Sequence, residues 1–97
     1  MTIKRTSIAS VHPGEFILYL LNEHALKQVD VAKRLKVSRA YLNDICRGRR
    51  GISPEMACKL ACIFGIDEEL ILNMQMKWEL AQIDRTSIKK EFKRIAA

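Results

Sequence analysis

Glycine, proline and long apolar runs are scarce in this 97-residue chain. Four glycines and two prolines interrupt a sequence that is 48% apolar, which predicts a folded and mostly helical protein. No apolar run approaches the roughly 18 residues that cross a membrane, and the N-terminus lacks the apolar core of a secretion signal. We therefore expect one soluble, cytoplasmic domain with no membrane partner.

The residue groups that hold metals or carry catalysis are also missing. The three cysteines, Cys46, Cys58 and Cys62, are odd in number and lack a CxxC spacing, which argues against a disulfide framework. Cys58 and Cys62 would share a helical face, but a zinc site needs four ligands, and His12 and His24 are distant in sequence. No paired carboxylates, catalytic triad or glycine-rich phosphate loop is recognisable. We expect no enzyme activity, no metal and no cofactor, with reduced cysteines in the core.

What the chain does contain is a pair of short amphipathic helices, predicted over residues 28–35 and 38–47. Apolar side chains recur on one face of each helix at a spacing of three to four residues. The link of Lys36, Val37 and Ser38 is so short that the second helix has to cross the first steeply, which is helix-turn-helix geometry. We expect Ser38 to cap the second helix. The inward-facing residues are Val31, Ala32, Leu35, Leu42 and Ile45.

The positive charge of the protein is concentrated on this pair of helices. Residues 27–50 hold eight lysines and arginines against two aspartates, whereas the rest of the chain holds nine cations against nine anions. The whole net charge of +6 therefore belongs to one segment. A basic face on two crossed helices is typical of a DNA-binding protein.

The N-terminal part is expected to be an arm followed by a covering helix. Residues 1–11 show no sustained pattern, so they are interpreted as a flexible arm that is either solvated or reaches a minor groove. His12-Pro13-Gly14-Glu15 opens the helix, because proline suits a first turn and an acid suits the positive helix end. His12 is interpreted as a cap rather than as a ligand or a base. This helix should cover the helix-turn-helix pair with Phe16, Ile17, Leu20 and Leu21.

A further helix is predicted from residue 53 to residue 64. Ser53 provides its cap and Gly65 ends it. Apolar residues, together with Cys58 and Cys62, surround most of its circumference, which predicts a central buried helix. The outward-facing positions are expected to be Glu55 and Lys59.

The C-terminal part, about residues 67–97, carries more apolar surface than one side of a small domain can bury. A helix that begins at Asp67 and continues to about Asp84 is followed by a last, basic helix that Thr86 or Ser87 would cap. Either this last helix or another chain covers the excess. Candidates for a homodimer interface are Leu70, Met74 and Trp78, which could equally belong to the core of one chain. The predicted organisation is an arm, 1–11, and one domain, 12–97.

A set of short motifs occurs along the chain in a fixed order. They are His12-Pro13-Gly14-Glu15, Val37-Ser38-Arg39, Gly48-Arg49-Arg50-Gly51-Ile52-Ser53, Met56-Ala57 with Lys59-Leu60-Ala61, and Leu72-Asn73-Met74-Gln75 with Trp78. In this order they resemble the HigA-type antitoxins, a branch of the Xre-like repressor superfamily. The resemblance covers about residues 11–82 and implies an all-α, lambda-repressor-like helix-turn-helix domain of five to six helices. Many relatives have glycine where this chain has Lys36, and a left-handed lysine there would cost about 1 kcal/mol.

The resemblance implies a homodimer that binds a palindromic operator in double-stranded DNA, represses its own operon and neutralises a RelE-like ribonuclease toxin of the HigB type. The second helix of the pair should lie in the major groove. Asp44 is expected to orient Arg39 or Arg47. We predict base contacts from Arg39, Ala40, Tyr41 and Asn43. Phosphate contacts are predicted from Gln28, Ser38, Arg47, Arg49 and Arg50, with Gln28 resembling a phosphate-binding residue of the superfamily.

Two other functions stay open at this point. One is a stand-alone Xre-type transcriptional regulator without a toxin partner, and nothing in the chain decides against it. The other is a protein-interaction module that keeps the repressor fold. The localised positive charge argues against such a module, because it would have no need of a basic face.

Overall fold

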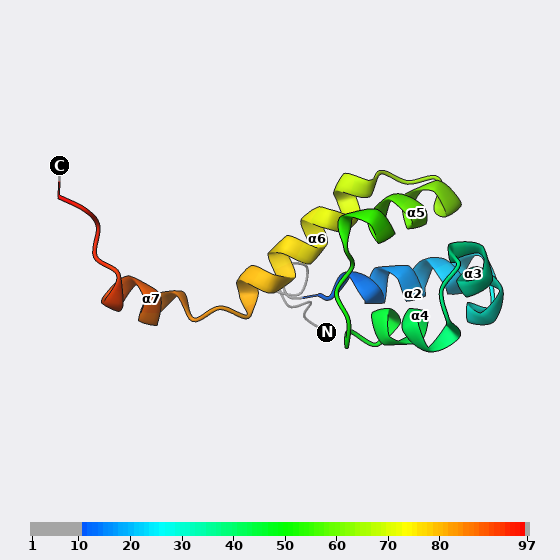
Figure 1. Ribbon diagram of the computed structural model, residues 1–97, viewed down its shortest axis with the longest axis horizontal. Coiled ribbons are helices and arrows are strands. Elements are labelled where there is room, and N and C mark those ends of the chain that lie inside the picture. The colour runs from blue at the N-terminus through cyan, green and yellow to red at the C-terminus, as the bar shows by residue number, and fades with distance from the viewer. Residues whose placement is uncertain (1–10, 97) are drawn as a thin grey trace, which may run out of the picture.

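The computed structural model describes residues 11–96, and within that range it contains six α-helices and no β-strand (Figure 1). The predicted all-α class is confirmed. Of the predicted arm, all residues except Val11 lie outside the described part. The helices are α2 (Pro13–Glu23), α3 (Gln28–Leu35), α4 (Arg39–Cys46), α5 (Pro54–Phe64), α6 (Glu68–Ala81) and α7 (Arg85–Glu91).

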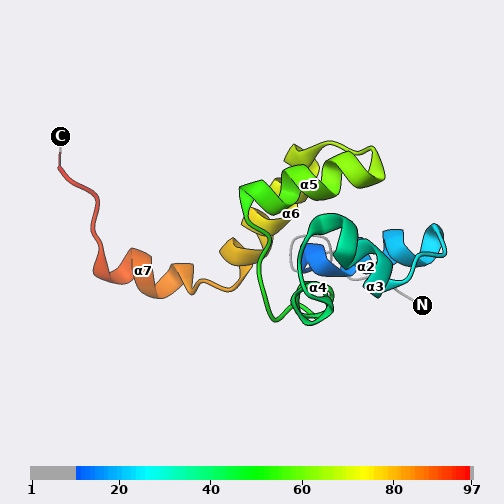
Figure 2. The same ribbon diagram turned by 45° about the vertical axis from the view of Figure 1, so that its right-hand side comes forward.

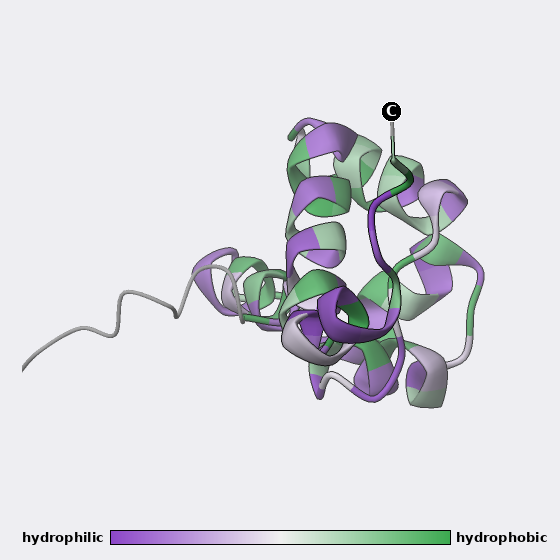
Figure 3. Cartoon of the chain, turned by 90° about the vertical axis from the view of Figure 1, so that its left-hand side faces the viewer, coloured by the Kyte–Doolittle hydropathy of each residue, from purple (hydrophilic) through white to green (hydrophobic). Residues whose placement is uncertain are grey.

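Helices α2 to α6 share one hydrophobic core. In Figures 1 and 2, α2 lies between α5 and α4, and it packs against α4 and α6. Ile17 and Leu21 of α2 are almost fully buried, and all five inward residues predicted for the helix pair are buried as well. Hydrophobic and hydrophilic residues alternate along the helices in Figure 3, as amphipathic packing around a single core requires.

The turn between α3 and α4 closes on a left-handed lysine. Lys36 has φ 62° and ψ 41°. Its N–H donates to the carbonyl of Lys33 at 3.1 Å, and the N–H of Val37 donates to the carbonyl of Ala32 at 3.0 Å. This pair of bonds is the Schellman arrangement, in which glycine usually takes the left-handed place. The turn therefore takes the conformation that glycine adopts without strain, and the lysine bears a conformational cost of about 1 kcal/mol.

Side-chain caps fix the starts of α4 and α5 where the sequence predicts them. The Oγ of Ser38 accepts the N–H of Tyr41 at 3.0 Å, and the Oγ of Ser53 accepts the N–H of Met56 at 3.2 Å. Gly65 ends α5 with φ 68°. Each cap satisfies a backbone group that the helix itself leaves free, a contribution of about 1 kcal/mol.

The prediction that α5 is buried on nearly all sides is wrong. Its buried stripe consists of Met56, Ala57, Leu60 and Ala61. Cys58 and Cys62 are exposed, so only Cys46 is the core thiol that the sequence predicted. Burial raises the pKa of Cys46, which keeps its thiol protonated and unreactive. The physical reason is that α5 packs on α6 and the core from one side, which leaves its other side in solvent.

The last helix does not cover the apolar surface of α6. Figures 1 and 2 show α7 beyond the end of α6, directed away from the other helices, and residues 79–96 are all exposed. The predicted cap is also corrected, because Asp84 takes this role instead of Thr86 or Ser87. Its carboxylate accepts the N–H of Ser87 at 3.1 Å and the hydroxyl at 2.7 Å, and these bonds lower the pKa of Asp84.

Candidate nucleic-acid interface

The N-terminal half of α4 presents most of the residues predicted to contact bases. Arg39 and Ala40 are exposed, and Asn43 is half-buried on the same side of the helix. Together with Arg47 they line one shallow hollow. Leu42 and Ile45 point the other way into the core with no exposed surface. The helix therefore has one face that holds the fold together and one that is free for a ligand.

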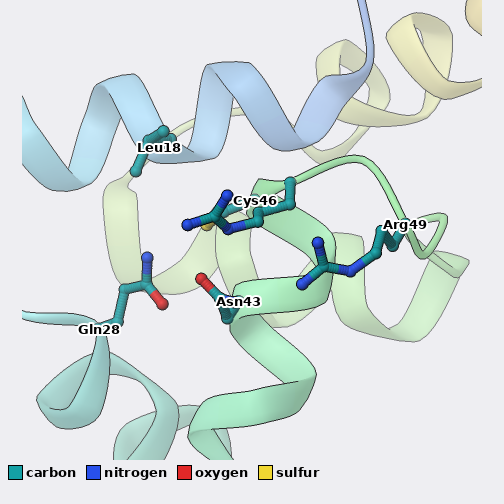
Figure 4. A pocket seen from close by; sticks show the side chains of 6 residues that line it. Leu18, Gln28, Asn43, Cys46 and Arg49 are labelled. Carbon is teal, nitrogen blue, oxygen red and sulfur yellow. The ribbon is translucent and has the colours of Figure 1, made fainter.

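A second hollow lies where α2, α3 and α4 meet (Figure 4). In Figure 4 the amide groups of Gln28 and Asn43 point toward each other across it, with Arg49 on the far side. The Oε1 atom of Gln28 is buried without a hydrogen-bond partner among the described residues. A buried acceptor without a partner costs free energy, so a ligand that donates a hydrogen bond to this oxygen is favoured. The lining residues are Leu18, Gln28, Asn43, Cys46, Arg47 and Arg49.

Tyr41 and Arg50 form a unit of their own. The guanidinium carbon of Arg50 lies 4.3 Å from the centre of the Tyr41 ring, a cation–π arrangement. Tyr41 is half-buried and packs against the hydrophobic core. A ring held on one side by the core and on the other by a cation supports Arg50 more readily than it reaches a base.

Asp44 pairs with Arg49, and not with Arg39 or Arg47 as predicted from the sequence. The Oδ1 of Asp44 lies 3.1 Å from the Nε of Arg49. Both side chains are partly exposed, so the ion pair adds little to stability. Its effect is positional, because it leaves the terminal nitrogens of Arg49 free while fixing the direction of the side chain.

His12 links the start of α2 to two other parts of the molecule. Its Nδ1 accepts the N–H of Gly14 at 2.9 Å, which confirms the predicted capping role. The ring is 5% exposed and stands edge-on to Trp78, with the centroids 4.8 Å apart. A Cβ added to Gly48 would lie 3.5 Å from the same ring. Burial lowers the pKa of His12, partly offset by Glu15, so the neutral ring is the capping form.

One buried polar side chain next to the loop between α4 and α5 was not predicted as a site residue. Gln75 of α6 is 8% exposed, and its Oε1 accepts the N–H of Ile52 at 2.9 Å. In the sequence it was noted only as part of the Leu72-Asn73-Met74-Gln75 motif. The available signal was its place one turn after Ile71, on the side of α6 that faces the core, where an uncharged amide requires a partner.

Within residues 11–96, no group of three or more histidines, cysteines and acids is close enough to hold a metal ion. In the same range no helix has the length and apolar character to span a membrane.

Known proteins share this helix-turn-helix geometry. A family model described as Helix-turn-helix matches residues 17–71. The chain belongs to this helix-turn-helix family. The chain is 41% identical over 73 residues to Virulence-associated protein A' of Dichelobacter nodosus. That match covers 74% of this chain but 64% of the relative, so the chain spans less than two thirds of that protein.

Solved structures similar to this helix-turn-helix protein include proteins in complex with operator or promoter DNA. The antitoxin HigA of Pseudomonas aeruginosa, solved with the higBA promoter, superposes with a TM-score of 0.82 at 32% identity, over 90% of this chain and 99% of that one. A Pseudomonas aeruginosa protein in complex with its 18 bp operator DNA gives a TM-score of 0.79 at 32% identity, over 88% and 96%. The match to these structures therefore extends over nearly the whole of each.

Proposed function

We propose that this helix-turn-helix protein binds double-stranded operator DNA through α4 and represses its own operon. The observation that carries the proposal is the meeting of exposed Arg39 and Ala40 with Asn43 and Arg47 around one hollow. This hollow lies in the segment that holds the whole net charge of the chain. The promoter and operator complexes of similar proteins support the proposal.

In the proposed complex α4 lies in the major groove. Arg39 donates to the N7 and O6 of a guanine, Ala40 meets the methyl group of a thymine, and Asn43 pairs with adenine or with a phosphate. Tyr41 takes part through its exposed edge near the sugar rather than through direct base contact, since it already supports Arg50. Arg39, Ala40 and Asn43 are therefore the positions that give sequence specificity.

The phosphate contacts surround this helix. Ser38 and Gln28 stand at the starts of α4 and α3, where backbone N–H groups favour anions. Arg47, Arg49 and Arg50 follow the end of α4 and give affinity and register without sequence preference. With roughly six phosphates neutralised per half-site, binding should weaken at least about tenfold over a few-fold rise in salt.

A palindromic operator requires a two-fold dimer with recognition helices about 34 Å apart. We place the dimer contact on α6, whose exposed apolar surface α7 leaves uncovered. Trp78 and Met74 are half-buried, with Trp78 engaged by His12, so they contribute their outer edges. The candidate interface comprises Leu70, Met74 and Trp78, with Met76 and Leu80 on the solvent side of the helix and Ile83 just after its end.

The finer proposal is that the protein is the antitoxin of a type II toxin–antitoxin operon and neutralises a RelE-like ribonuclease toxin. Its similarity to antitoxin HigA supports this. Since the segments between helices are short within residues 11–96, the longest being 47–53, we expect the toxin to bind folded surface. A gene for a small basic ribonuclease beside this one, and co-purification of the two proteins, would support the antitoxin role. Their absence would leave a stand-alone regulator.

DNA binding is tested by fluorescence anisotropy with a duplex from upstream of the gene and a scrambled duplex of equal length. Tighter binding to the upstream duplex, localised by footprinting, is the expected result. Equal affinity for both duplexes would contradict an operator-specific role. Absence of binding to either duplex at low ionic strength would contradict DNA binding altogether and favour a protein-interaction module.

A further inference from the structure

A side chain of α6 holds the basic loop between α4 and α5 in place. We define this basic loop as residues 48–52; it contains Arg49 and Arg50. Gln75 reaches its end from a position 23 residues further along the chain, accepting the N–H of Ile52 at 2.9 Å. The other end of the Gln75 amide, Nε2, donates to the Oε2 of Glu79 at 2.8 Å. Both polar ends of this buried side chain are therefore used.

The glycine next to Ile52 allows this close support. A Cβ added to Gly51 would lie 3.0 Å from the Nε2 of Gln75, tighter than ordinary van der Waals contact. At the other end, Gly48 lies against the ring of His12, which in turn rests on Trp78 of α6. The basic loop thus meets α6 at both ends, directly through Gln75 and indirectly through His12.

The two arginines between these supports are fixed from the opposite side by α4. Arg49 is paired with Asp44 and Arg50 lies over Tyr41. A loop whose backbone and side chains are already in place loses less conformational entropy when it meets a phosphate backbone. The side-chain contacts are on the exposed surface, so the buried bond from Gln75 is the one that fixes the backbone.

We propose that Gln75 is a positioning residue for DNA binding, which sets the backbone of the basic loop so that Arg49 and Arg50 face phosphates. The proposal rests on the proposed function and adds a role for a residue that does not touch DNA. In this proposal α6 is both the candidate dimer helix and the support of the basic loop. The same helix then sets the distance between the two recognition helices of the dimer and the position of the arginines that contact phosphates.

The test uses Gln75→Leu and a swapped double variant, Gln75→Glu with Glu79→Gln. The leucine keeps the approximate size but removes the acceptor for Ile52. In the swapped variant the new carboxylate can accept both the Ile52 N–H and the amide of residue 79, so the network is kept with its polarity reversed. Ile71→Val, which trims a fully buried side chain of the same helix, controls for lost stability.

Gln75→Leu should weaken binding to upstream and scrambled duplexes alike, about three- to tenfold, and lower the salt slope by about one to two. The swapped variant should restore both, and Ile71→Val should change neither. Unchanged affinity and salt slope in folded Gln75→Leu, or no recovery in the swapped variant, would overturn the proposal.

Hydrogen exchange of the Ile52 amide gives a readout that needs no DNA. We expect slow exchange in the wild type and the swapped variant, and fast exchange in Gln75→Leu. Fast exchange in the wild type would overturn the proposal even if a variant fails to fold. A wild type that binds no duplex would refute the proposed function instead. Exchange of the Ile52 amide is measured without DNA, so the two failures are distinguishable.

Discussion

The ring of His12 stands edge-on to the indole of Trp78, at an interplanar angle of 75° and a centroid separation of 4.8 Å. This contact joins the N-cap of α2 to the last turn of α6, two helices that are far apart in the sequence. Because the same histidine caps α2 through Gly14, the start of one helix and the packing of another depend on one neutral ring.

Acidification should destabilise the protein through His12. Burial holds the pKa of His12 in the folded state below the ordinary value of 6.5. At a pH between the folded and the unfolded pKa, the unfolded chain therefore binds more protons than the folded one. The free energy of unfolding should therefore fall as the pH drops through 6.5 toward the folded pKa, with no contribution from His12 above about pH 7. Urea denaturation of the wild type and His12→Asn across this range measures the difference. Both proteins keep His24, and equal pH dependence in the two would exclude His12 as the cause.

Gly14→Ala should be strongly destabilising although alanine favours helices. A Cβ at Gly14 would collide with the backbone carbonyl of Ile45, which is fixed inside α4. Relieving this overlap should cost about 3 kcal/mol in the free energy of unfolding. The matched control is Gly65→Ala, where φ is 68° and no atom lies within 4 Å of the added Cβ; strain alone predicts about 1 kcal/mol there. Equal losses at the two sites in urea denaturation would contradict the close approach of α2 to α4.

Lys36→Gly should stabilise the protein by about 1 kcal/mol, because it removes a left-handed side-chain residue from the turn. Ala25→Gly, at φ 52° in the turn after α2, should act similarly. The two variants differ in charge, so a phosphate contact by Lys36 would appear as weaker DNA binding in Lys36→Gly alone. Thermal unfolding and anisotropy on the same samples provide both quantities. Destabilisation by both substitutions would show that the turns gain more from their side chains than they lose in strain.

Arg39→Ala and Arg49→Ala should affect DNA binding in different ways. Loss of Arg39 should cost about 1 to 3 kcal/mol on the operator and relax the preference at one base pair. Loss of Arg49 should weaken operator and random duplexes equally and reduce the salt slope by about one. Binding to a set of operators with single base changes measures both patterns. If the two variants lost specific and random binding in the same proportion, the base contact assigned to Arg39 would be incorrect.

Leu80→Glu should disrupt the proposed dimer, since it places a charge on the exposed apolar side of α6. Sedimentation velocity at micromolar concentration is expected to show a dimer for the wild type and a monomer for the variant. Val29→Glu changes a similarly exposed apolar residue on α3 and should leave the dimer intact. A wild type that sediments as a stable monomer would refute the dimer proposal.

Much of the fold could be predicted because its determinants are local. Ser38 and Ser53 cap the helices that follow them, and Leu42 and Ile45 face inward, since capping and helical periodicity act within about four residues. The surplus charge of the helix pair is likewise a count along the chain. The same local pattern failed for Cys58 and Cys62, because it gives the apolar character of a helix but not how many of its sides have neighbours.

The sequence by itself determined the starts of α2 to α5, the serine caps of α4 and α5 and the segment that carries the charge. Only the tertiary structure decided that Asp44 takes Arg49, that Gln75 holds Ile52 and that α7 leaves α6 uncovered. These contacts depend on where a side chain is brought by the packing of other helices. Packing is set by the shapes of all the surfaces at once, and no spacing of residues along one helix encodes it.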